Sequence, residues 1–177
     1  MKRIFIKPEL CEECKNCQVA CLAEHSPSRS VWFVNLSDQG SQPRNFVELN
    51  NEGRPVPLSC RQCDEPECVN ACVSGALQRD PATGLVVHNQ KQCASCWMCV
   101  MSCPYGMILP DARENKIAIK CDFCADRGTP RCVEACPTGA ISLIEAPSPG
   151  ADGGYYVLTG GVNPQIEGSQ TGALFSS

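Results

Sequence analysis

Apolar positions along this chain come in short runs of three to six residues, separated by glycine, proline or polar residues. Runs of this length between turn residues are typical of short β-strands. Two pairs of neighbouring runs predict hairpins, because a turn-rich segment joins the members of each pair. The predicted strands are residues 3–6, 31–36, 46–49, 76–79 with 85–88, 107–109 with 116–119, and 141–144. No stretch approaches the roughly 18 consecutive apolar residues of a membrane span, so none is predicted.

Sixteen cysteines lie between these runs, in four groups of four. Each group opens with C-x-x-C and closes with C-x-x-x-C, and only the middle gap varies. This recurrence indicates an internal repeat of a metal-binding unit. The groups are Cys11, Cys14, Cys17 and Cys21; Cys60, Cys63, Cys68 and Cys72; Cys93, Cys96, Cys99 and Cys103; and Cys121, Cys124, Cys132 and Cys136.

The last three groups continue into the same phrase, in which a glycine follows the final cysteine by three residues and an apolar run comes next. Glycine adopts the left-handed conformation without a Cβ penalty, which suits the end of a short helix. The phrase therefore predicts a helix that ends at Gly75, Gly106 or Gly139, followed by a strand. The first group lacks this glycine and runs on to His25, so its helix should be longer.

The composition leaves few side chains from which to build an ordinary core. The hydrophobic share of 43% counts the cysteines, and aromatic residues make up only 6% of the 177 residues. A disulfide framework would need an oxidising compartment. The N-terminus, MKRIFIKPEL, has no apolar stretch of the kind that a secretory signal needs. We therefore expect a cytoplasmic protein with reduced thiols, in which dense cysteines bind metal.

The formal net charge is −4 and omits any thiolates. No basic stripe interleaved with aromatic residues is visible, so the sequence does not support nucleic-acid binding.

The spacing of the cysteines favours [4Fe–4S] clusters over single metal ions. A tetrahedral zinc site usually takes two C-x-x-C pairs 15 to 20 residues apart, whereas a C-x-x-C-x-x-C loop presents three sulfurs to one object with three metal corners. In two-cluster ferredoxins the fourth cysteine ligates the other cluster, so the groups should work in pairs. The spacing alone leaves open whether the first group pairs with the second or with the fourth. A zinc-scaffolded binding module is the alternative from another class.

Sixteen thiols, at four for each cube, account for four [4Fe–4S] clusters and leave no iron open to a substrate. We therefore predict electron transfer, with no catalytic residue. His25 is interpreted as a polar group at a helix end, and Trp97 as a residue that packs against a cluster. The segment around Trp32 and Phe33 is either a docking surface or part of a structural hairpin. Tyr155 and Tyr156 contact a partner, form a strand or belong to a disordered tail.

The cysteine spacings over residues 1–145 resemble those of the four-cluster ferredoxin-type subunits that serve formate dehydrogenase, dimethyl sulfoxide reductase and hydrogenase complexes. The short length and the stretch Ala20–Ser26 look most like the iron–sulfur protein associated with carbon monoxide dehydrogenase. This resemblance implies an α+β fold of two pseudo-symmetric bacterial-ferredoxin-like lobes with an inserted hairpin and an extended tail. The implied boundaries are 1–25 with 109–145 for one lobe, 59–108 for the other, 26–58 for the insert and 146–177 for the tail.

The resemblance also implies which cysteines share a cluster, because in that family the first group pairs with the fourth and the second with the third. The implied ligand sets are Cys11, Cys14, Cys17 and Cys136; Cys21, Cys121, Cys124 and Cys132; Cys60, Cys63, Cys68 and Cys103; and Cys72, Cys93, Cys96 and Cys99.

The function implied is that of an electron-transfer subunit of an anaerobic hetero-oligomeric oxidoreductase complex. We expect the donor enzyme to be nickel carbon monoxide dehydrogenase, and the acceptor to be a hydrogenase or a nicotinamide-reducing flavoprotein. The alternative is a relay subunit of a formate dehydrogenase or hydrogenase complex.

Overall fold

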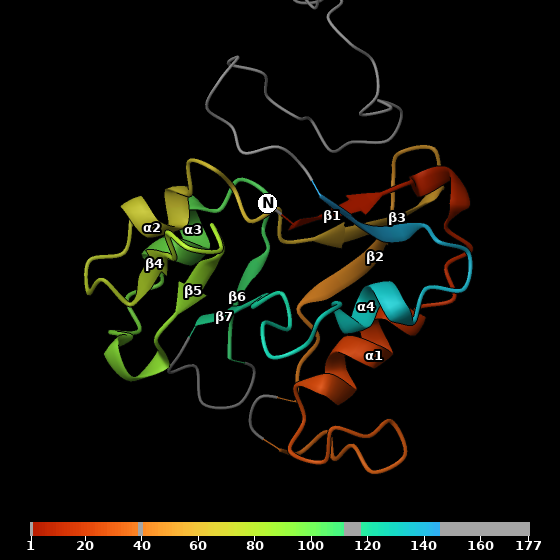
Figure 1. The fold of residues 1–177 in the computed structure, drawn as a ribbon, viewed down its shortest axis with the longest axis horizontal. Coiled ribbons are helices and arrows are strands. Elements are labelled where there is room, and N and C mark those ends of the chain that lie inside the picture. Colours follow the sequence, from red (N-terminus) through yellow and green to blue (C-terminus); the bar gives the residue numbers. More distant parts are fainter. Residues whose placement is uncertain (1, 39–40, 112–117, 146–177) are drawn as a thin grey trace, which may run out of the picture.

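The computed structural model describes residues 2–38, 41–111 and 118–145, which form a small α+β fold of short helices and paired strands (Figure 1). The tail predicted for residues 146–177, with its two tyrosines, lies outside the described residues. In the described part of the chain, no helix is long and apolar enough to cross a membrane. The elements are β1 (Lys2–Ile6), a 3₁₀ turn (Pro8–Leu10), α1 (Asn16–Glu24), β2 (Asn45–Leu49), β3 (Pro55–Ser59), α2 (Glu67–Asn70), β4 (Leu77–Arg79), β5 (Val86–His88), a 3₁₀ turn (Gln90–Gln92), α3 (Met98–Ser102), β6 (Ile108–Pro110), β7 (Ala118–Lys120), α4 (Arg131–Glu134) and β8 (Ile141–Glu145).

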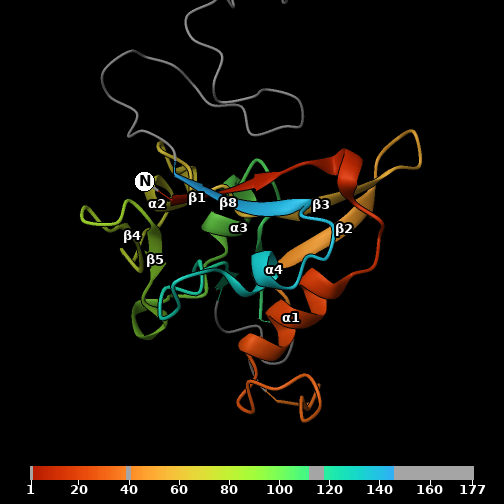
Figure 2. The same cartoon turned by 45° about the vertical axis from the view of Figure 1, so that its right-hand side comes forward.

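The strands form antiparallel pairs, and each pair is a two-stranded sheet. β1 and β8 bring the two ends of the described chain together, with Ile4 opposite Leu143 (Figure 2). The hairpin predicted between the second and third cysteine groups is confirmed as β4–β5. The hairpin predicted after the third group is confirmed as β6–β7, although residues 116 and 117 lie outside the described residues.

The predicted strand at residues 31–36 is wrong. Turns and irregular chain occupy this segment, and Trp32 and Phe33 are 90% and 78% exposed. Local hydrogen bonds explain the difference, because the Phe33 N–H donates to the Ser30 carbonyl at 3.3 Å and the Asn35 side chain accepts from the Ser37 N–H at 2.9 Å. Such local bonds compete with a strand ladder. The inserted hairpin is instead β2–β3, in the second half of the insert.

The last three cysteine groups each fold into a short helix, a glycine turn and a strand, but the helices do not extend to the glycines as the sequence predicts. α2, α3 and α4 span four, five and four residues, whereas α1 spans nine. Gly75, Gly106 and Gly139 have φ values of +67°, +63° and +70°, in turns that follow the helices. α2, α3 and α4 end at Asn70, Ser102 and Glu134, four or five residues before the glycine. The glycine therefore does not cap the helix but forms the turn that leads into the next strand.

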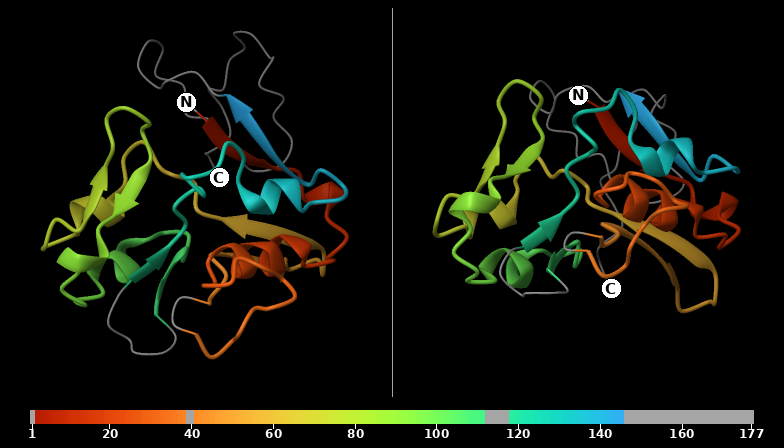
Figure 3. Two further views of the ribbon diagram at one scale, coloured as in Figure 1. Left: turned by 60° about the horizontal axis from the view of Figure 1, so that its bottom comes forward. Right: turned by 90° about the horizontal axis from the view of Figure 1, so that it is seen from below.

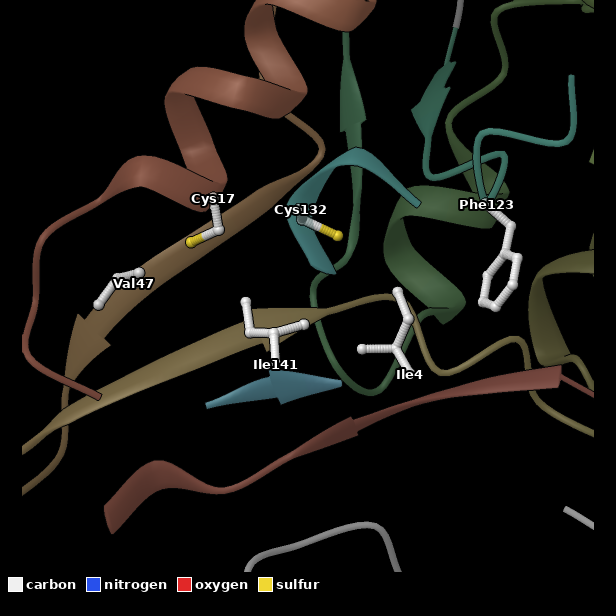
Figure 4. Close-up of a cluster of buried hydrophobic side chains, with 6 residues drawn as sticks. All are labelled: Ile4, Cys17, Val47, Phe123, Cys132 and Ile141. Atoms are coloured by element: carbon white, nitrogen blue, oxygen red, sulfur yellow. The ribbon is translucent and has the colours of Figure 1, made fainter. Parts of the chain in front are cut away.

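Two separate cores hold these elements together, one on each side of the molecule (Figures 1 and 3). In the first core, α1 and α4 pack over the β1–β8 pair, and cysteine side chains lie among the aliphatic ones (Figure 4). Its buried members are Ile4, Cys17, Val47, Phe123, Cys132 and Ile141. The second core packs α2 and α3 against β4 to β7, and its buried members are Leu77, Val86, Cys99, Ile108 and Ala118.

Candidate iron–sulfur sites

The loops that carry the cysteines have an unusual backbone conformation in common. In each of the four groups, the residue before the second cysteine has a positive φ, although none of the four is glycine. Successive right- and left-handed residues turn their N–H groups toward one centre and form a concave nest for an anion, a device found at many iron–sulfur sites. The residues are Glu13 (φ 54°), Gln62 (φ 50°), Ser95 (φ 54°) and Phe123 (φ 64°).

All sixteen cysteines are free thiols, and electrostatic contacts show which of them lie together. Burial, together with the nearby thiols of its own loop and of Cys136, raises the pKa of Cys17 to about 11. Cys17 belongs to the first group and Cys136 to the fourth. The first and fourth groups therefore meet at this site, which we call the Cys17 set: Cys11, Cys14, Cys17 and Cys136.

A second site also joins the first and fourth groups. Burial raises the pKa of Cys132 to about 12, and the nearby thiols of Cys21 and Cys124 contribute to the rise. Burial likewise raises the pKa of Cys121, with further contributions from Cys60 and Cys21. These residues form what we call the Cys132 set: Cys21, Cys121, Cys124 and Cys132.

The remaining two sites join the second and third groups. Burial raises the pKa of Cys68 to about 11, and thiols of both groups add to the rise. The four thiols of this Cys68 set line one pocket, and those of a further Cys99 set line another. The Cys68 set is Cys60, Cys63, Cys68 and Cys103, and the Cys99 set is Cys72, Cys93, Cys96 and Cys99.

Matching hydrogen bonds surround the last cysteines of two groups. The pKa of Cys72 and of Cys136 is lowered overall. Burial alone would raise it, but the hydrogen bonds to each sulfur outweigh the effect of burial. The Leu77 N–H donates to the sulfur of Cys72, and the Ile141 N–H does the same for Cys136. A hydroxyl two residues on, from Ser74 or Thr138, also lies beside each sulfur. Such bonds stabilise a thiolate.

His25 lies at the end of α1, as the sequence predicts, and interacts with one predicted ligand. Its Nδ1 lies 2.7 Å from the Cys21 carbonyl oxygen and 3.6 Å from the Cys21 sulfur. Its Nε2 lies 3.1 Å from a carboxylate oxygen of Asp122. Burial lowers the pKa of His25, but the hydrogen bonds with Asp122 and Cys21 outweigh it and raise the pKa to about 9.

One ligand atom each from His25, Asp122 and Cys124 lies within 4.8 Å of the other two, close enough to ligate a single ion. Arg44 argues against that reading, because its Nη1 donates to Asp122 at 2.6 Å and occupies the carboxylate. The Arg44 N–H also donates to the Cys21 sulfur at 3.3 Å. We interpret the group as hydrogen bonds that position Cys21.

Sequence reasoning missed two buried polar residues beside the thiols. Gln62 is 1% exposed and Lys120 is 5% exposed. Gln62 lies between two cysteines of its group, and Lys120 directly precedes Cys121. In the sequence, only their position next to predicted ligands could have drawn attention to them. A glutamine or lysine on the surface of the protein could stand at the same position, so the sequence does not reveal that these two are buried.

The residues at each site fit a [4Fe–4S] cluster. Each site offers four sulfurs from two chain segments, on loops that carry a left-handed residue before the second cysteine, and four thiolates are the donor set that such clusters take. The 4Fe–4S dicluster domain family matches residues 53–146. The chain belongs to this family.

Relatives extend the likeness beyond the matched domain. An iron-sulfur protein of Rhodospirillum rubrum is 34% identical over 80% of this chain and 81% of its own length. The aliphatic sulfonate oxidoreductase, polyferredoxin-like subunit of Pyrococcus furiosus is 39% identical over 75% of this chain and 70% of its own length. The electron transport protein HydN of Escherichia coli is 31% identical over 76% of this chain and 83% of its own length. The chain is thus a ferredoxin-type iron–sulfur electron-transfer protein of the kind found in oxidoreductase complexes.

Proposed function

We propose that this chain holds four [4Fe–4S] clusters, one in each of the Cys17, Cys132, Cys68 and Cys99 sets, and relays electrons between two redox proteins. The observation that carries the proposal is the meeting of thiols from groups far apart in sequence, such as Cys17 with Cys136. Each bound cluster would supply a one-electron carrier. With all sixteen thiols engaged, the chain offers no open coordination position, and its role is transfer alone.

The four sets form a continuous series. Cys17 and Cys132 interact across the first two sets, and Cys121 and Cys60 interact across the Cys132 and Cys68 sets. α2 carries Cys68, and Cys72 of the last set follows directly after that helix. This order places the Cys17 and Cys99 sets at the two ends of the relay.

The two end sets are also the ones that contain a fully exposed cysteine. Cys14 and Cys96 are the two exposed cysteines among the sixteen, and they belong to the Cys17 and Cys99 sets. Transfer between proteins needs an exposed terminal carrier at each partner's contact. We therefore propose that the donor meets one of these ends and the acceptor meets the other.

The family fold suggests how the series is built. We propose two pseudo-symmetric ferredoxin-like lobes, 1–25 with 109–145 and 59–108, each holding two clusters, with residues 26–58 as an insert. The matching surroundings of Cys72 and Cys136 support the symmetry. The β6–β7 hairpin crosses the boundary at residue 109 and packs in the second core, so it links the two lobes.

We propose nickel carbon monoxide dehydrogenase as the donor and a hydrogenase or nicotinamide-reducing flavoprotein as the acceptor, in a cytoplasmic hetero-oligomeric complex. The resemblance of the stretch Ala20–Ser26 supports this partner, and sixteen free thiols suit a reducing compartment. Anaerobic purification of a tagged chain from its native cells tests the partner. Co-purification of the dehydrogenase is expected, and co-purification of a formate dehydrogenase alone would replace it.

Metal analysis tests the cluster proposal itself. Protein purified without oxygen should be brown, absorb broadly near ~400 nm and contain about sixteen irons per chain. Reduction should give paramagnetic signals from interacting clusters. A colourless protein with about four zinc ions would instead identify the zinc-scaffolded module.

A further inference from the structure

Lys120, at the end of β7, is a buried cation with neutral hydrogen-bond partners. Its Nζ donates to the carbonyl oxygens of Val86 and Cys121, each at 2.8 Å, and to Oε1 of Gln62 at 3.3 Å. Within residues 2–38, 41–111 and 118–145, no carboxylate forms an ion pair with Lys120. Burying an ammonium group without an anion is costly, so this position calls for negative charge nearby.

The predicted cluster ligands surround Lys120 on two sides. It lines the same pocket as all four thiols of the Cys68 set. On its other side it directly precedes Cys121 of the Cys132 set and also lines the pocket beside that residue.

Gln62 holds Lys120 in this position and ties the two sets together. Its Nε2 donates to the Cys121 carbonyl at 3.0 Å, while its Oε1 accepts from Lys120 and from the Val86 N–H at 2.9 Å. Because Gln62 lies in the C-x-x-C loop of the Cys68 set, the loop of one set is bonded to a ligand residue of the other. The ammonium is thus fixed at the junction between the two inner sets.

We propose that the Lys120 ammonium is the shared counter-charge of the Cys68 and Cys132 sets and makes both easier to reduce. The proposal rests on the ligand sets of the proposed function. Reduction adds one electron, delivered by the donor protein, to a site that is already anionic, and no proton or bond change accompanies it. A fixed positive charge in a low-dielectric interior stabilises that added electron more than the surrounding water would. Lys120 therefore acts as a fixed charge that raises the reduction potentials of the two inner sets, between which the electron passes.

Redox titration of the iron-loaded protein, followed by electron paramagnetic resonance, tests this role. In Lys120→Met we expect about sixteen irons per chain. We expect two of the four reduction transitions to move to lower potential. The reduction equilibrium constant of each should fall about tenfold or more, which corresponds to about 59 mV for a one-electron couple. Lys120→Arg keeps the charge and should keep the wild-type potentials. Arg54→Met removes an equally charged side chain that is 78% exposed, and should leave all four transitions in place.

Iron-loaded Lys120→Met with four unchanged potentials would overturn the proposal and leave the four-cluster relay intact. Wild-type protein without iron would instead overturn the proposed function. If Lys120→Met does not load iron, Lys120→Gln is the second variant, because it removes the charge and keeps a hydrogen-bond donor for the carbonyl oxygens of Val86 and Cys121. It should lower the same two potentials, and unchanged potentials in iron-loaded Lys120→Gln would likewise contradict the role of Lys120.

Discussion

Two kinds of left-handed residue shape the cysteine-bearing segments. The glycines in the turns after the helices are visible in the sequence, because glycine alone takes this conformation without strain. The positive φ values of Glu13, Ser95 and their counterparts are not visible, because ordinary side chains occupy those positions. Such residues cost free energy and persist where the surroundings over-determine them. We attribute them to the ligation geometry of each loop.

Gly106 allows a test of backbone conformation without interference from packing. A Cβ added there would meet nothing within 4 Å, yet φ is +63°. Gly106→Ala should therefore lower the free energy of unfolding of the iron-loaded protein by about 1 kcal/mol, through left-handed strain alone. Denaturant titration measures this change.

Gly128→Ala is the matched control, because its Cβ would also meet nothing within 4 Å and its backbone is outside the left-handed region. We expect no loss of stability in this variant. Equal losses in the two variants would show that the φ of Gly106 carries no structural demand.

At the scale of elements, the sequence predicts most strands that have a partner and an apolar face, but it misses β3, which contains two prolines and pairs with β2. Residues 3–6 and 141–144 pair as β1 and β8, and the apolar pattern located both strands within one residue. Residues 31–36 have the same apolar appearance but no partner strand in the described chain, and local hydrogen bonds of Phe33 and Asn35 hold the segment in turns. Apolar pattern alone does not separate these cases, because pairing is decided by residues far away in the sequence.

Substitution at Trp32 tests the corrected description of this segment. Because Trp32 is 90% exposed and lies outside any sheet, Trp32→Ala should change the free energy of unfolding by less than about 0.5 kcal/mol. Ile141→Ala in β8, where the side chain is 3% exposed, should cost about 2–5 kcal/mol. A large loss at Trp32 would mean that the segment packs as the predicted strand after all.

At the scale of the whole molecule, polar contacts fasten the two cores to each other. Arg3 of β1 donates to the Gln62 carbonyl at 2.6 Å and pairs with Asp64 at 2.5 Å, and Arg79 of β4 pairs with the same carboxylate at 2.9 Å. Sequence reasoning found the cysteine groups, but it could not place these contacts, because charged residues near ligands have no distinguishing pattern. The cysteine spacing likewise left open which groups share a cluster, so the pairing of the first group with the fourth was taken from the family resemblance.

Removal of iron should dismantle both cores. Cys17, Cys132 and Cys99 are buried core members, so each core loses its central contacts when the thiols are no longer tied together. Oxidative removal of iron in the presence of a chelator should therefore abolish protection of backbone amides against hydrogen exchange. An iron-free protein with the protection pattern of the loaded protein would contradict this expectation.

The crossed pairing of cysteine groups is tested most directly by the iron content of paired cysteine substitutions. Cys17→Ala and Cys136→Ala remove ligands of one set, so each variant and the double variant should retain about twelve irons per chain, one cluster fewer than the parent protein. Cys17→Ala with Cys21→Ala removes ligands of two sets and should leave about eight irons. If the Cys17 and Cys136 changes together cost twice the iron of either alone, the two residues hold different clusters and the proposed arrangement is wrong.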